Sequence, residues 1–215
     1  MKSAVATVFI ALMALVSVDL ELAVAQSSSS AVTRLSLAGP AKRYCSGIWV
    51  SNRNRREALY NSVLLEDALV EDYEDGYLAF RVDNRRQIVT ATRDGVSASA
   101  RYFGDQGCVI LRPETDKPIF APREVVSLLA DADSTAWPMG DALPDSPLPA
   151  DVDATLLDQA ANMFFSNDLD RRAAFIVVHR GRIIKEEYGS GAHAGMQLES
   201  WSMGKSMTAT FIGRL

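Results

Sequence analysis

The sequence predicts an α+β protein, with a small antiparallel α+β unit followed by the first part of a second domain. Three short runs between residues 77 and 103 alternate apolar and polar residues, which is typical of half-buried strands. Apolar residues recur at helical spacing over residues 151–165 and again over 202–215. Seven of the eight prolines lie between residues 113 and 149, which predicts a linker between the two parts.

The composition excludes several classes of protein. The chain has 215 residues, of which 48% are hydrophobic and 23% charged, the profile of an ordinary globular protein. Its net charge is -5, whereas binding to nucleic acid or to an anionic membrane would require a basic stripe on the surface. We therefore expect neither partner. The two histidines, His179 and His193, lie far from both cysteines. We therefore expect no metal. We also expect no cofactor.

Residues 1–25 are typical of a signal peptide. Lys2 supplies a positive start, Ala4–Val18 are mostly apolar, and Ala23-Val24-Ala25 fits a cleavage site. A membrane-spanning helix needs about 20 apolar residues, and Asp19 interrupts this stretch earlier. The pattern predicts a periplasmic or secreted protein with no stable membrane span after cleavage. An uncleaved anchor remains the alternative.

The first unit is predicted over residues 44–112, after a flexible start at 26–43. Asp94-Gly95 between two alternating runs is a strong hairpin signal. In an oxidising compartment Cys45 and Cys108 are expected to form a disulfide between the first and last strands, with two free buried thiols as the alternative. The predicted elements are a strand at Cys45–Val50, a helix at Arg56–Leu65, and strands at Tyr77–Val82, Gln87–Thr92, Ser97–Phe103 and Cys108–Leu111.

The second unit is predicted over residues 151–215, after a Pro-rich linker at 113–150. The linker has one segment with helical character, Glu124–Ala132. Asp151 or Asp153 can cap a helix that runs to about Phe165. The remaining elements are a hairpin of Ala173–His179 and Arg182–Tyr188 around Arg180-Gly181, and a helix over Ser202–Leu215.

Ser202-Met203-Gly204-Lys205 is a Ser-x-x-Lys tetrad at the start of the last predicted helix. Residues three apart share a helix face, so the amine of Lys205 can accept the hydroxyl proton of Ser202 if burial keeps that amine neutral. A serine at a helix N-terminus also lies near N–H groups that favour an oxyanion. Such a tetrad also arises by chance on a structural helix, so its context decides the interpretation.

The context resembles a known family. Ser200-Trp201-Ser202-Met203-Gly204-Lys205-Ser206-Met207-Thr208 closely resembles the nucleophile motif of serine β-lactamases, DD-peptidases and their relatives. The run from Ala174 to Ile184, with Tyr188-Gly189, resembles the two strands that open that family's catalytic domain. The resemblance covers about Leu148–Leu215 and leans to the class C β-lactamase and 6-aminohexanoate-dimer hydrolase branch. More faintly, residues 43–112 resemble the N-terminal extension of its longer members.

The resemblance implies the first part of a β-lactamase-like α/β sandwich domain and a serine hydrolase. Ser202 would be the nucleophile and Lys205 its base, acting on a small-molecule amide, ester or β-lactam through an acyl-enzyme. The family's second motif, commonly Tyr-x-Asn, and its Lys-Thr-Gly-like strand cannot be placed before Leu215. We therefore expect an N-terminal fragment of a protein about twice this length, or an incomplete gene model, that is inactive alone. The alternative is a non-catalytic binding or cell-wall-associated protein.

Three other motifs are weaker. Gly204-Lys205-Ser206 ends like a phosphate-binding loop, but Glu199 stands where that loop needs glycine. The glycines around residues 189–194 mimic a dinucleotide fingerprint without a following crossover unit. A Ser-His-Asp triad would need His179, predicted within a strand, or His193, predicted within a loop.

Overall fold

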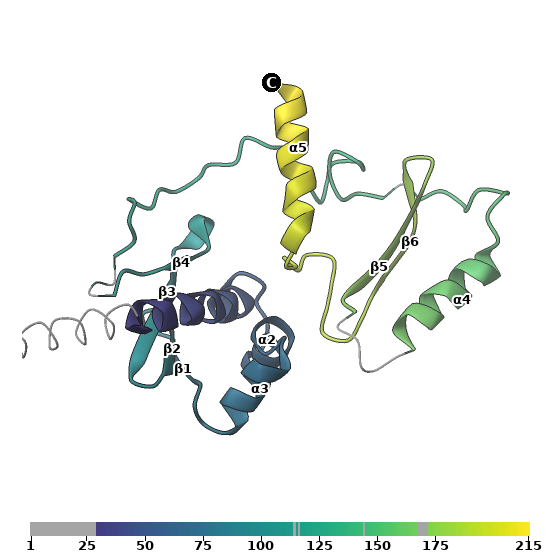
Figure 1. Ribbon diagram of the computed structural model, residues 1–215. Coiled ribbons are helices and arrows are strands. Elements are labelled where there is room, and N and C mark those ends of the chain that lie inside the picture. Colours follow the sequence, from purple (N-terminus) through teal and green to yellow (C-terminus); the bar gives the residue numbers. More distant parts are fainter. Residues whose placement is uncertain (1–28, 114, 116, 144, 167–171) are drawn as a thin grey trace, which may run out of the picture. The chain divides into compact units, whose positions relative to one another are not determined.

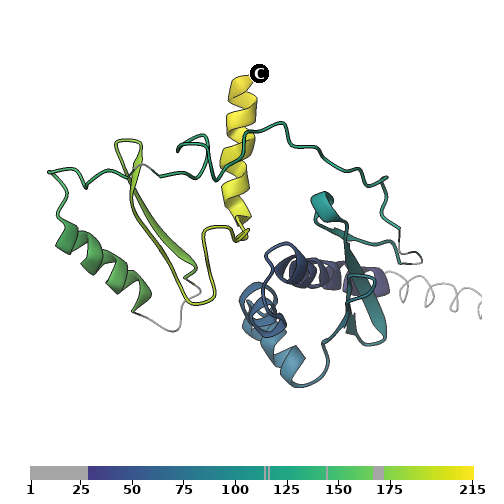
Figure 2. The same ribbon diagram turned by 180° about the vertical axis from the view of Figure 1, so that it is seen from behind.

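The computed structural model describes residues 29–113, 115, 117–143, 145–166 and 172–215 (Figures 1 and 2). The predicted signal peptide lies outside these residues. The described chain forms two units, one ending at Arg123 and the other comprising Ser51–Arg53 and Glu124–Leu215. Helices and a four-stranded antiparallel sheet occur together, which confirms the α+β class. None of the described helices combines the length and apolarity needed to cross a bilayer.

A helix over residues 29–49 opens the first unit, drawn in purple in Figure 1. Two predictions were therefore wrong: the flexible start at 26–43, in its described part, and the strand at Cys45–Val50. Pro40 lies within this helix and removes one helical hydrogen bond. Burial outweighs that cost, since this helix contributes one apolar stripe to the core: Leu37, Ala38, Ala41, Tyr44 and Cys45.

The predicted helix at Arg56–Leu65 is present as α2 (Arg55–Ala58), continued by a π-helical turn at Leu59–Val63. The side chain of Asn54 caps α2 by accepting a hydrogen bond from the Glu57 N–H group at 3.0 Å. A further helix, α3 (Asp67–Glu74), was not predicted. No residue of α3 is fully buried, although Leu69, Val70 and Tyr73 are partly buried where they pack against the core.

The four predicted strands of the meander are present. They are β1 (Ala79–Asp83), β2 (Ile88–Arg93), β3 (Val96–Tyr102) and β4 (Cys108–Ile110), in the order β1-β2-β3-β4. Asp94 and Gly95 turn between β2 and β3 with φ of 51° and 75°, the left-handed pair that a tight hairpin requires. The core face of the sheet pairs Val89 with Ala100 and Ala91 with Ala98.

Cys45 and Cys108 form a disulfide with a Cα–Cα distance of 6.0 Å. The predicted pairing is confirmed, but it joins the helix of residues 29–49 to β4 rather than two strands. Both cysteines are buried in the same core, at 0% and 4% exposure. The covalent link therefore fixes the helix against the last strand of the sheet.

In its described residues, the second unit contains a helix, a β-hairpin and a further helix. Helix α4 (Ala154–Phe165) precedes the antiparallel strands β5 (Ala174–His179) and β6 (Arg182–Tyr188). Arg180 and Gly181, with φ of 49° and 77°, make the turn between them. A turn at Trp201–Met203 leads into α5 (Gly204–Arg214).

The helix predicted at Glu124–Ala132 is absent from the structure, where this segment is irregular. Its apolar side chains are exposed, including Leu128 at 96% and Leu129 at 87%. An isolated helix of about nine residues is unstable in water without a packed face, which explains the wrong prediction.

Candidate active site

The candidate nucleophile lies where the connector after β6 enters the last helix. Ser202 occupies the turn Trp201–Met203, and Lys205 lies in the first turn of α5. Trp201, directly before Ser202, has a φ of 45°, a left-handed conformation that is unusual for a bulky side chain. Backbone strain of this kind costs about 1–3 kcal/mol and is concentrated at functional sites in proteins.

The structure brings the two predicted site residues together. The Nζ atom of Lys205 lies 2.8 Å from the Oγ atom of Ser202, within hydrogen-bond distance. Their spacing of three residues places both on one face where the turn continues into α5. The pair therefore has the geometry for proton transfer between a serine hydroxyl and an amine.

The surroundings of this pair are open. Ser202 and Lys205 are both exposed to solvent. The apolar side chains next to them are exposed as well, with Trp201 at 64%, Met203 at 71% and Met207 at 58%. Within the described residues, the Ser202–Lys205 pair is therefore open to solvent.

Two backbone donors that could serve an oxyanion are already used. The Met203 N–H group donates to the Ser200 carbonyl at 2.9 Å, and the Gly204 N–H group donates within the same turn. The N–H groups expected near Ser202 are present, but these two are already hydrogen-bonded within the turn. In this conformation these two N–H groups are therefore not available to an oxyanion.

The side chain of His179 contacts a group other than the candidate pair. His179 Nε2 lies 3.6 Å from the Asp151 carboxylate, which also accepts a hydrogen bond from Arg180 at 2.8 Å. Among the described residues, no group of three or more His, Cys, Asp or Glu side chains is placed to hold a metal ion. The candidate chemistry thus depends on Ser202 and Lys205.

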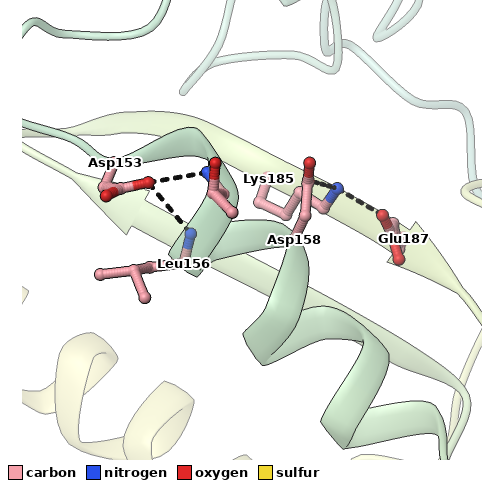
Figure 3. Close-up of polar contacts among 6 residues, drawn as sticks. Asp153, Leu156, Asp158, Lys185 and Glu187 are labelled. Carbon is pink, nitrogen blue, oxygen red and sulfur yellow. Dashed lines mark hydrogen bonds and ion pairs between the residues drawn. The ribbon is translucent and has the colours of Figure 1, made fainter.

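A polar cluster between α4 and β6 supports the hairpin that leads to this site, and of its contacts only the Asp153 cap was among those expected from the sequence (Figure 3). The Asp153 side chain caps α4, and Lys185 on β6 donates to Asp158 on α4 at 2.8 Å. Lys185 also pairs with Glu187, and the hydrogen bonds to Asp158 and then Glu187 raise the pKa of Lys185. On α4, Phe164 packs on Phe175 of β5 with ring centroids 5.3 Å apart. Only the alternation along β6 could have suggested that Lys185 faces the helix.

The chain was compared with models of protein families, with curated proteins and with solved structures. No match was found in any of the three comparisons.

Proposed function

We propose that Ser202 and Lys205 are the nucleophile and base of an exported serine acyl hydrolase that resembles the β-lactamase and DD-peptidase family. The observation that carries the proposal is the 2.8 Å contact between Lys205 Nζ and Ser202 Oγ at the start of a helix. The motif from Ser200 to Thr208 supports it, since its residues resemble that family's nucleophile motif. The substrate class is a small-molecule amide, ester or β-lactam.

The proposed reaction has two steps. A neutral Lys205 amine accepts the hydroxyl proton of Ser202 while Oγ attacks the carbonyl carbon of the substrate. The tetrahedral intermediate collapses, the leaving amine or alcohol takes a proton from the Lys205 ammonium, and an ester to Ser202 remains. Water then attacks this ester, releasing the carboxylic acid and restoring the serine hydroxyl.

The proposal requires two features beyond the described pair. Lys205 must be covered, because an unperturbed lysine has a pKa near 10.4 and is protonated at pH 7. An N–H donor must also face the developing oxyanion, which typically contributes about 10²–10³-fold in kcat. We therefore expect the 215-residue chain by itself to be inactive, with further protein segments completing the site.

Covalent labelling of the native protein tests the nucleophile. A fluorophosphonate and a fluorescent penicillin should each form an adduct on the tryptic peptide that follows Lys185 and ends at Lys205. Fragmentation should place the adduct on Ser202 rather than on the neighbouring Ser200. Ser202→Ala should abolish labelling, and the matched control Ser200→Ala should retain it.

The base is tested by two substitutions at Lys205. Lys205→Met retains most of the side-chain length and removes the amine, and Lys205→Arg retains a charge that does not deprotonate, so both should slow acylation by orders of magnitude. An adduct on a different serine, or wild-type acylation of Lys205→Met, would refute the proposal. Penicillin binding without any covalent adduct would favour the non-catalytic binding protein instead.

A further inference from the structure

The first unit has a surface cavity of about 630 Å³ that the proposed hydrolase chemistry does not use. One wall is a face of the helix over residues 29–49, formed by Ala31, Arg34, Leu35 and Ala38 at spacings of three, four and seven residues. The opposite wall comprises residues 97–99 of β3 and residues 110–113, which are the last residue of β4 and the three that follow it. Cavities of this size are typical of small-molecule sites.

The cavity has a clear origin in the fold. Strand β4 pairs only with residues 100–102 of β3. Residues 97–99 of β3 therefore have no paired β4 residue on that side, and they border the cavity instead. The helix places the small side chains of Ala31 and Ala38 opposite this edge. Short side chains on one wall and a short partner strand on the other leave a hollow between them.

The charge of the lining is positive. Among the described residues, the cavity is lined by two arginines, Arg34 and Arg112, and by no acidic side chain. Neither guanidinium has an ion pair or hydrogen bond with the described residues, and the Nε atom of Arg34 is buried without a partner. A buried donor without a partner is costly, and an anionic oxygen would satisfy it. Glu114 and Asp116, beside Thr115 in the sequence, lie outside the described residues.

The rest of the lining is mostly apolar, with Leu35, Ile110, Leu111 and Pro113 as its largest such residues. We propose that this cavity binds a small organic carboxylate that has an apolar body. The carboxylate pairs with Arg34 and Arg112, and the apolar body lies against Leu35 and Ile110. This site is independent of the proposed Ser202 chemistry.

Octanoate is a suitable probe, titrated into the full ¹⁵N-labelled chain and followed by amide NMR shifts. We expect saturable shifts centred on Ala31, Ser97 and Leu111, with a dissociation constant on the order of 0.1–1 mM for a ligand of this size. Octan-1-ol, which lacks the charge, should bind at least about tenfold more weakly. Octyltrimethylammonium, which has the opposite charge, should cause no saturable shift at these amides.

Substitutions separate the charge from the shape of the cavity. Arg34→Gln and Arg112→Gln should each weaken octanoate binding about tenfold or more, since each removes a charge-assisted hydrogen bond. Arg85→Gln makes the same charge change in the exposed turn before β2 and should leave binding unchanged. Ala31→Leu fills the cavity from an exposed helix position, so it should weaken octanoate and octanol alike.

Two results would overturn the proposal. The first is octanol binding as tightly as octanoate, which would show that the arginines contribute nothing. The second is wild-type octanoate binding in the Arg34→Gln and Ala31→Leu variants when both retain the wild-type circular dichroism spectrum.

Discussion

The contact between the helix of residues 29–49 and α2 depends on the absence of a side chain at Gly47. A Cβ atom built at Gly47 would lie 2.8 Å from the Cβ atom of Ala58 and 3.5 Å from its Cα atom. Carbon atoms in good contact are about 3.5–4.0 Å apart, so the added methyl group overlaps by roughly 1 Å. Ala58 is fully buried and its Cβ cannot rotate away, so the two helices would have to separate.

The size of the effect follows from two opposing terms. Alanine in place of glycine within a helix stabilises it by about 1 kcal/mol. Overpacking a closely packed core costs about 1–3 kcal/mol. We therefore predict that Gly47→Ala destabilises the first unit by about 1 kcal/mol, although the same substitution in a free helix is stabilising.

A double-mutant cycle isolates the overlap. Ala58→Gly alone removes a packed methyl group and lowers helix propensity, but it also makes room for a Cβ atom at position 47. The losses of free energy of unfolding in the two single variants should exceed the loss in Gly47→Ala/Ala58→Gly by about 1–3 kcal/mol. Urea unfolding followed by the amide NMR signals of Val89 and Ala91, both in the core of the first unit, measures each value.

The cycle has a clear contrary result. If the single-variant losses add within about 0.5 kcal/mol, residues 47 and 58 do not interact. If Gly47→Ala is stabilising, the close helix approach at this point does not exist in solution.

Three further predictions concern stability and ionisation. Replacing Cys45 and Cys108 by alanine removes a disulfide between residues 63 positions apart, which should lower the free energy of unfolding of the first unit by about 4 kcal/mol. Urea titrations measure this loss, and a loss below about 1 kcal/mol would contradict the prediction. Asp153→Ala removes the cap that accepts hydrogen bonds from two N–H groups of α4, so it should lower the stability of α4 by about 1 kcal/mol. Faster amide exchange in α4 measures this loss, and Asp153→Asn should retain most of the protection. The hydrogen bond to Glu186, with burial second, raises the pKa of Tyr188 to about 12, so its contribution to stability should be present below pH 10 and lost between about pH 10 and 12. Absorbance at 295 nm should show a step near pH 12 that Tyr188→Phe removes and Glu186→Gln moves to lower pH.

Local patterns were sufficient for several elements. Asp94-Gly95 and Arg180-Gly181 adopt the left-handed turn conformations of tight hairpins, and the flanking alternation placed the strands correctly. Asp153 rather than Asp151 caps α4, a choice that the sequence analysis left open. These features depend on neighbouring residues, so a single sequence contains the necessary information.

The sequence by itself determined the contact between the side chains of Ser202 and Lys205. Residues three apart on a helical turn lie next to each other regardless of the surrounding structure. Only the tertiary structure decided which apolar segments are helical. Residues 29–49 form a helix despite Pro40 because a sheet covers their apolar stripe. Glu124–Ala132 is irregular, and its apolar side chains are exposed to solvent. Burial also sets whether Lys205 can act as a base, and burial arises from contacts between distant segments, which no local pattern specifies.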